Sequence, residues 1–146
     1  YPQVVDGFDL EVRHWLELPL EVSPRVPAAL RGKAAVYHDP CILSRYLRLV
    51  REPRALLQQM PLNLREAERH GEWSTCCGGG GGFELLFPRM AHVLAVSRVE
   101  ELRATGAELA ITCCPGCLIQ LRKGVKALGS SAEVLDMSEI LLEAQA

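Results

Sequence analysis

The sequence lacks any concentration of basic charge and any long apolar run. Its 146 residues carry a formal net charge of −2, and its lysines and arginines are scattered along the chain. Nucleic-acid binding usually requires a basic patch, so we expect no nucleic-acid partner. No apolar stretch approaches the ~18 residues that a membrane-spanning helix needs, so we expect no transmembrane segment.

The start of the chain lacks an initiating Met and the basic end of a signal peptide. We therefore expect a fragment of a larger protein, folded as one domain over residues 1–146 after an irregular or helical lead-in at residues 1–32. Within this lead-in, the pattern suggests a strand at Val4–Val5 and a helix over residues 8–18. The composition, 49% hydrophobic and 23% charged, is that of a globular domain able to bury its own core.

The six cysteines do not follow the pattern of a secreted disulfide scaffold. Two pairs are vicinal, Cys76-Cys77 and Cys113-Cys114, and a chain with a sufficient core does not need disulfides to fold. We therefore expect reduced thiols and a cytoplasmic location, which includes the cytoplasmic face of a membrane-associated complex.

From Lys33 onward, short apolar runs alternate with longer stretches of helical periodicity. This alternation predicts an α/β fold, with a mostly parallel sheet of about four strands and helices on both faces. The expected strands are 34–37, 62–67, 108–112 and 133–135, and the main expected helices are 53–60, 85–102, 115–128 and one capped by Ser138. The apolar face of the long second helix is expected to comprise Leu85, Leu86, Met90, Val93, Leu94, Val99 and Leu102.

Five cysteines follow three of these strands: Cys41 the first, Cys76 and Cys77 the second, Cys114 and Cys117 the third. Because ligands of parallel sheets bind at the carboxyl ends of the strands, we expect these five thiols to converge at one edge. Thiolates select zinc or iron–sulfur clusters, and five exceed the four ligands of a mononuclear zinc site. The surplus favours a polynuclear iron–sulfur centre.

Two alternatives stay open at this point. The first is a zinc site with four cysteine ligands, in which the remaining thiol is a spectator. The second is a redox-active dithiol formed by Cys114 and Cys117, a C-x-x-C pair at the start of a predicted helix, where the helix dipole favours thiolate.

Neighbouring side chains that leave a strand point in opposite directions, so we expect Cys114 to face the site and Cys113 to be a spectator. The run of glycines begins with Gly78 and Gly79, directly after Cys77. Glycine lets the backbone approach a ligand closely and point its N–H groups at an anion, so we expect these two residues to line the cofactor. A phosphate-binding loop is excluded because no Lys-Ser or Lys-Thr follows the glycines.

His38 and Asp39 precede Cys41. His38 could bond a cysteine sulfur or a substrate, or it could finish the strand through backbone bonds. Asp39 could be catalytic, but an Asp before a proline more often forms a turn. We assign no catalytic residue from the sequence.

The segments His38-Asp39-Pro40-Cys41, Cys76-Cys77-Gly78 and Cys114-Pro115-Gly116-Cys117, in this order, resemble the cysteine-rich CCG domain over about residues 34–142. That domain occurs in a subunit of heterodisulfide reductase and in relatives such as the iron–sulfur subunits of glycolate oxidase and lactate-utilisation systems. The resemblance implies an iron–sulfur redox domain, with a non-cubane [4Fe–4S] centre in the reductase itself and zinc in some members.

The resemblance also implies that other domains or subunits of a redox complex, of flavin or ferredoxin type, are the partners. Ile42 and Ser44 differ from the residues that relatives often have at these positions, and only one CCG copy is present. We therefore expect an electron-transfer part of a heterodisulfide reductase-like or 2-hydroxy-acid-oxidising oxidoreductase rather than a complete enzyme.

Overall fold

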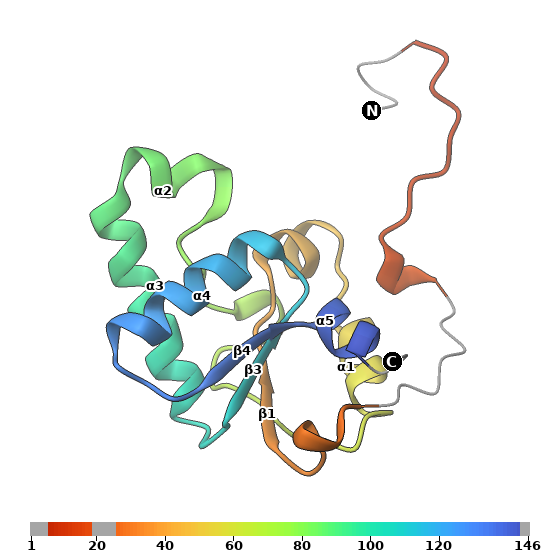
Figure 1. The fold of residues 1–146 in the computed structure, drawn as a ribbon. Helices are drawn as coiled ribbons and strands as arrows, with labels where there is room; N and C mark the ends of the chain where they lie inside the picture. Colours follow the sequence, from red (N-terminus) through yellow and green to blue (C-terminus); the bar gives the residue numbers. More distant parts are fainter. Residues whose placement is uncertain (1–5, 19–25, 144–146) are drawn as a thin grey trace.

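A four-stranded parallel sheet forms the centre of the computed structural model, which describes residues 6–18 and 26–143 (Figure 1). The strands are β1 (Ala34–Tyr37), β2 (Asn63–Arg65), β3 (Leu109–Thr112) and β4 (Glu133–Asp136), in the order β2-β1-β3-β4. Ala35 of β1 lies opposite Leu64 of β2 and Leu109 of β3, which sets the register. The predicted α/β fold with four parallel strands is confirmed.

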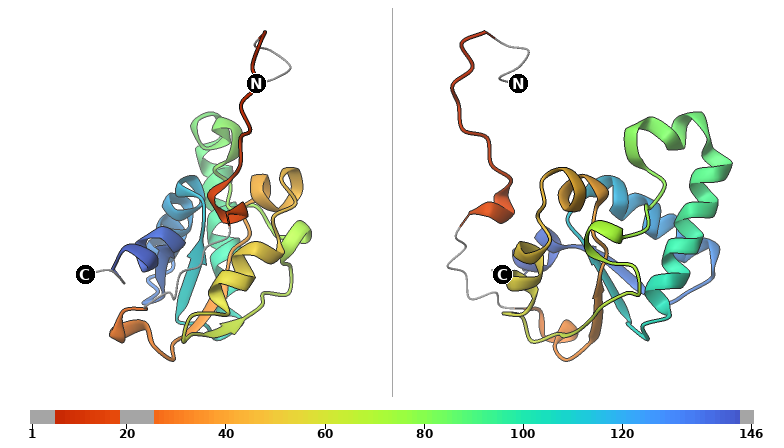
Figure 2. Two further views of the ribbon diagram at one scale, coloured as in Figure 1. Left: turned by 90° about the vertical axis from the view of Figure 1, so that its right-hand side faces the viewer. Right: turned by 180° about the vertical axis from the view of Figure 1, so that it is seen from behind.

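Two helical layers cover the sheet because successive side chains of its central strands point to opposite faces. On one face, Tyr37 and Ile111 belong to a core that also contains side chains of α1 (Arg51–Leu57) and α5 (Met137–Glu143). On the other face, Val36 and Ala110 meet α3 (Pro88–Arg103) and α4 (Pro115–Ala127). Figure 2 shows these helices from two further directions.

The strand order places a topological switch point between β1 and β3. The chain leaves β1 through α1 on one face, whereas α3 and α4 lie on the other face. Loops that leave neighbouring strands toward opposite faces open a crevice at the carboxyl ends of those strands, where parallel sheets bind their ligands. The cysteine-bearing loops begin at this edge.

The remaining elements are short. Two 3₁₀ turns, η1 (Trp15–Glu17) and η2 (Ala28–Leu30), precede the sheet, and a π-helical turn, η3 (Ile42–Tyr46), follows Cys41. Two more 3₁₀ turns, η4 (Gly71–Trp73) and η5 (Gly80–Gly82), flank Cys76 and Cys77. A four-residue helix, α2 (Phe83–Leu86), comes before α3.

The helix predicted over residues 8–18 is wrong. Only η1 forms there, and residues 8–14 have no helical structure. In this segment polar Asp9, Glu11 and Arg13 alternate with apolar residues, and such an alternation gives a helix no continuous apolar face. The strand predicted at Val4–Val5 lies outside the described residues.

The helix predicted over 85–102 is divided at Phe87, whose backbone (φ −131°, ψ 59°) separates α2 from α3. As a consequence, the expected apolar face is partly wrong. Four of its seven members are exposed to solvent: Leu85, Leu86, Met90 and Val93. The buried face of α3 is instead Ala91, Ala95, Arg98, Val99 and Leu102.

The last helix begins at Met137, two residues earlier than an N-cap at Ser138 would place it. The Ser138 N–H donates to Asp136 Oδ1 (3.0 Å), and the Asp136 N–H donates to Glu139 Oε2 (2.7 Å). The Asp136 side chain thus accepts from the second residue of the helix, so Asp136 is the N-cap and the predicted role of Ser138 is wrong. In residues 6–18 and 26–143, every helix is too short or too polar to cross a bilayer.

Candidate metal centre

The five predicted thiols lie in three segments at the carboxyl edge of the sheet. Cys41 leads from β1 into η3, Cys76 and Cys77 precede η5, and Cys114 and Cys117 open α4. The sulfurs of Cys77 and Cys117 are 3.2 Å apart. The pKa of Cys76 is raised by its interactions with Cys77 and Cys41, and the pKa of Cys114 is lowered by its interaction with Cys117. Cys77 and Cys117 are thus in contact, and we call them, together with the other three thiols on loops at this edge, the thiol cluster.

The thiols of this cluster share their protons unequally. Hydrogen bonds from the thiols of Cys117 and Cys76 hold the pKa of Cys77 well below its ordinary value. The pKa of Cys117 is raised in turn, because Cys114 and Cys77 favour its protonated form. The pKa of Cys114 is lowered to about 6, mainly by a hydrogen bond from Cys117. Burial opposes this shift, and backbone N–H groups assist it. Negative charge thus concentrates on Cys77 and Cys114, which suits a bound cation.

Cys113 does not join this cluster. Its sulfur lies 3.8 Å from Met137 Sδ, in the core on the opposite face of the sheet from Cys77 and Cys117. Burial raises the pKa of its thiol to about 12. The alternation of side chains at the end of β3 accounts for this separation of Cys113 from Cys114.

The glycine loop is pressed against the two helices that cover the site. Gly78 has φ +85°, and a Cβ at this position would lie 2.7 Å from the carbonyl oxygen of Ala91 in α3. A Cβ on Gly79 would lie 2.9 Å from Cγ of Gln120 in α4. The Gly78 N–H donates to the Cys76 sulfur at 3.3 Å, and the Gly79 N–H donates to the Cys77 sulfur. Only glycine lets the loop backbone lie this close to α3 and α4 and direct these N–H groups at the sulfurs.

The π-helical turn η3 fixes the direction in which the chain leaves Cys41. Ser44 is fully buried, and both its backbone N–H (2.9 Å) and its hydroxyl (3.1 Å) donate to the carbonyl oxygen of Pro40. Single π turns occur often at functional sites. This one closes the loop directly beside the first thiol.

His38 faces the thiols and also completes the strand. Its backbone N–H donates to the Ile111 carbonyl at 2.8 Å, and its ring is buried. A ring nitrogen of His38 and the sulfurs of Cys77 and Cys117 all lie within 4.8 Å of one another. Burial lowers the pKa of His38, and contact with Cys77 opposes this shift.

Arg98 belongs to the site but was not predicted from the sequence. Its Nε donates to Nδ1 of His38 at 3.0 Å, and 0% of its surface is exposed. A signal was available, because Arg98 is three residues from Ala95 and four from Leu102, on what is otherwise the apolar face of its helix. A charged side chain at such a position indicates a buried partner.

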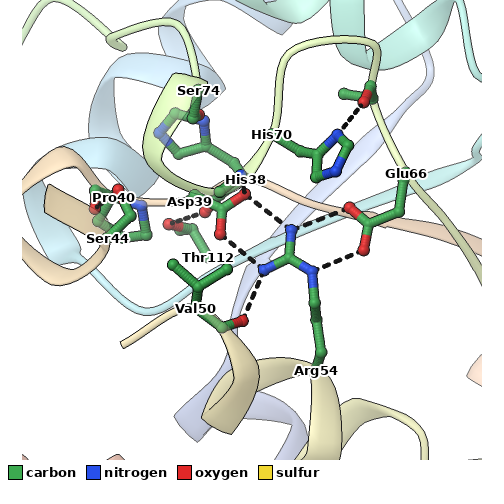
Figure 3. Close-up of polar contacts among 12 residues, drawn as sticks. His38, Asp39, Pro40, Ser44, Val50, Arg54, Glu66, His70, Ser74 and Thr112 are labelled. Carbon is green, nitrogen blue, oxygen red and sulfur yellow. Dashed lines mark hydrogen bonds and ion pairs between the residues drawn. The ribbon is translucent and has the colours of Figure 1, made fainter. Parts of the chain in front are cut away.

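Asp39 serves as an anchor for the loops around the site (Figure 3). Its carboxylate accepts from Nη1 and Nη2 of Arg54, at 2.8 and 3.0 Å, and from the Gly71 N–H at 2.8 Å. Arg54 also donates to both carboxylate oxygens of Glu66. These bonds join β1, α1 and the segment that leads to Cys76, and they occupy the oxygens of Asp39.

The donors at this edge fit a soft metal centre. Five cysteines lie on three segments at this edge, two of their sulfurs are in contact, and backbone N–H groups lie beside two of the sulfurs. Sulfur ligands select zinc, copper(I) and iron–sulfur clusters, and N–H···S bonds are characteristic of the last. The sequence profile of a family described as "Cysteine-rich domain", named CCG, matches residues 35–122. The chain belongs to the CCG family.

Relatives of this CCG domain are parts of redox proteins. One subunit of the dihydromethanophenazine:CoB–CoM heterodisulfide reductase from Methanosarcina barkeri is 36% identical over 114 residues, which are 77% of this chain and 28% of the relative. The "Probable iron-sulfur-binding oxidoreductase FadF" of Bacillus subtilis is 32% identical over 146 residues, covering 95% of this chain and 20% of the relative.

A third relative is the lactate utilization protein A of Shouchella clausii, which is 32% identical over 119 residues. The match covers 77% of this chain and 46% of that protein. The chain therefore spans less than half the length of each of these three curated relatives.

Proposed function

We propose that this CCG domain holds an iron–sulfur cluster of the [4Fe–4S] type, in a non-cubane form, and exchanges electrons with a partner. The parent protein is a heterodisulfide reductase-like or 2-hydroxy-acid-oxidising oxidoreductase. The observation that carries this proposal is the contact between the sulfurs of Cys77 and Cys117 at 3.2 Å.

The proposed ligands are Cys41, Cys76, Cys77, Cys114 and Cys117. When bound, the cluster would supply one-electron redox chemistry. The protein's own contribution is to hold the five sulfurs together and to offset their negative charge. Gly78 and Gly79 do the latter, because their N–H groups donate to the sulfurs of Cys76 and Cys77.

The number of thiols favours this cluster over a mononuclear zinc ion. A structural zinc site uses four ligands in a tetrahedron and leaves the fifth thiol without a role. Zinc remains the alternative cofactor, and the proximity of His38 to Cys77 and Cys117 supports it. A dithiol–disulfide reaction of Cys114 and Cys117 is the other alternative, supported by the lowered pKa of Cys114.

The proposed partner binds at the cysteine edge, where the domain exposes its apolar side chains. Within residues 26–143, the exposed large apolar residues lie in four segments. These are η3 with the residue after it, η4, the stretch from α2 into α3, and the second turn of α4. Trp73 is 83% exposed and Leu85 is 81% exposed. A concentration of exposed apolar surface next to a functional site is typical of a protein interface. The partner would be another domain or subunit of the redox complex, of flavin or ferredoxin type.

Anaerobic analysis of bound metal tests the proposal. The chain should be purified without oxygen or reconstituted with iron and sulfide, and iron, acid-labile sulfide and zinc measured per chain, together with the visible absorption. We expect iron and sulfide in about equal amounts. Zinc without sulfide would establish the alternative cofactor, and a colourless, metal-free protein that cycles between dithiol and disulfide would establish the third function.

A further inference from the structure

We propose that Arg98 fixes the tautomer of His38, so that His38 donates a hydrogen bond from Nε2 to the Cys77 sulfur and is not itself a metal ligand. The role of this bond in tuning a cluster rests on the proposed function. The tautomer itself does not.

Three contacts hold the Arg98 guanidinium in place. Its Nη1 donates to the Arg69 carbonyl at 3.0 Å and pairs with Glu101 Oε2 at 2.9 Å, while its Nε donates to His38 Nδ1 at 3.0 Å. Arg98 is fully buried, so its guanidinium has little freedom to rotate away from these three partners. Its charge is compensated by Glu101 within the same cluster.

The contact with Arg98 assigns the role of each ring nitrogen of His38. A guanidinium in a protein stays protonated, and all of its N–H groups are donors. His38 Nδ1 must therefore be the acceptor in this contact. In a neutral imidazole that accepts at one nitrogen, the proton sits on the other nitrogen, which is Nε2.

The Nε2 proton of His38 then requires an acceptor of its own. Within the part of the chain that the structure describes, Nε2 is buried and has no partner inside ordinary hydrogen-bond limits. A ring nitrogen of His38 and the sulfurs of Cys77 and Cys117 lie within 4.8 Å of one another. Of the two, Cys77 is the thiol whose pKa is lowered by His38, so we assign the Nε2 proton to the Cys77 sulfur. An N–H···S bond to Cys77 gives the buried Nε2 its partner.

The same contacts argue against His38 as a ligand, although it lies close to two thiols. A metal-bound imidazole normally donates its second N–H to a carboxylate, a carbonyl or water. If Nε2 bound a metal, Nδ1 would carry its proton toward the Nε–H of Arg98. Two donors would then face each other at 3.0 Å in a buried position, with no acceptor between them.

The network also reaches the ligand loop from a second direction. Glu101, the partner of Arg98, accepts from the Thr75 hydroxyl at 2.8 Å and from the Arg69 N–H at 3.1 Å. Thr75 directly precedes Cys76. Arg98 is therefore a positioning residue, which orients His38 and, through Glu101, the loop that carries Cys76 and Cys77.

The tautomer can be measured without any metal. Two-bond proton–nitrogen correlations of the full chain, with ¹⁵N-labelled histidine rings, reduced and metal-free at pH 8, distinguish a proton on Nε2 from one on Nδ1. His38 is assigned by its disappearance in His38→Gln. We expect the Nε2–H form alone in the unmodified chain, loss of this preference in Arg98→Met, and no change in Arg103→Met, which replaces an exposed arginine of the same helix. A proton on Nδ1 in the unmodified chain would overturn the proposal, even if Arg98→Met failed to fold.

The second readout is the midpoint potential of the iron-loaded chain. An N–H···S bond stabilises the more negative, reduced state of a cluster, so His38→Phe should shift the potential to more negative values without loss of iron. His38→Gln, whose amide can still donate, should recover part of the shift. Iron loss in His38→Phe as large as in Cys77→Ser would identify His38 as a ligand and overturn the proposal. Absence of iron and sulfide in the unmodified chain would contradict the proposed function instead, and the tautomer measurement would stand.

Discussion

The sulfurs of Cys77 and Cys117 lie 3.2 Å apart, although 40 positions separate the two residues in the sequence. Cys77 reaches this point from the glycine loop and Cys117 from the first turn of α4. The contact exists because both segments meet at the carboxyl edge beside β1 and β3, where the strand order reverses. Two sulfurs buried at this distance cannot both ionise without a nearby positive charge, which a metal centre would supply.

The two neighbouring cysteines at the end of β3 should differ in their effect on metal content. We expect Cys113→Ala to retain its iron and Cys114→Ala to lose most of it. The reason is that the Cys113 sulfur lies beside Met137 on the far face of the sheet, whereas Cys114 bonds Cys117. Iron and sulfide per chain, measured after identical anaerobic reconstitution, check this. Equal losses in the two variants would show that the two thiols have the same role.

A Cβ at Gly78 should disturb the site far more than a Cβ at Gly80. Gly78→Ala forces a left-handed backbone, at about 1–2 kcal/mol, and adds a contact of 2.7 Å with the Ala91 carbonyl oxygen. Gly80→Ala meets no atom within 4 Å and does not require positive φ. We expect a lower melting temperature and reduced cluster content for Gly78→Ala only. Thermal unfolding of the two metal-free chains, followed by circular dichroism, separates the backbone effect from the loss of metal.

The sheet and the convergence of the cysteines were predictable from the sequence because both depend on local patterns. Cys41 and Cys114 each follow an apolar run that can only be a buried strand, and parallel strands end at one edge. The opposite orientations of Cys113 and Cys114 follow from the same alternation. The capping of the last helix was missed because Asp136 and Ser138 are both good N-caps, and only the hydrogen bonds distinguish them.

The contacts between distant segments were not predictable. Arg98 meets His38 because α3 presents its buried face to the end of β1, and the sequence does not give that relative placement. Leu85 and Leu86 were predicted to be buried but are exposed. The apolar periodicity of a helix is the same whether the helix packs on its own core or on a partner. The break at Phe87 decides between the two, and it depends on φ and ψ values that sequence pattern does not specify.

The ion pair between Asp39 and Arg54 should contribute more to stability than the pair between Arg48 and Glu72. Asp39 is buried, and in Asp39→Asn one carboxylate oxygen becomes an NH₂ group that must face donors of Arg54 or Gly71. Among the residues that the structure describes, the charge of Arg54 is then compensated only by Glu66. We expect Asp39→Asn to lower the free energy of unfolding by about 2–4 kcal/mol. Urea denaturation of the reduced, metal-free chain measures this.

The exposed pair provides the matched control. The side chains of Arg48 and Glu72 are 67% and 48% exposed, so Glu72→Gln should cost less than about 1 kcal/mol. A cost for Asp39→Asn as small as that for Glu72→Gln would mean that Asp39 does not anchor the loops around the site. Its carboxylate would then have to be reconsidered as a group kept for chemistry.

The isolated chain should hold its cluster without turning over a hydroxy acid or a heterodisulfide. Its sequence contains no dinucleotide-binding fingerprint, no ferredoxin-type run of cysteines and no second CCG copy, so electrons have no built-in route to or from the site. Its exposed apolar side chains are expected to lie under the proposed partner, which would supply the missing route. We expect dithionite to bleach the visible absorption of the loaded chain, because the cluster accepts electrons. Steady-state assays with either substrate should give no higher rate than the Cys77→Ser variant. Turnover well above that of Cys77→Ser, with dithionite or a viologen dye as the only donor, would show that this single domain is a complete enzyme and that its apolar edge is not needed for electron delivery.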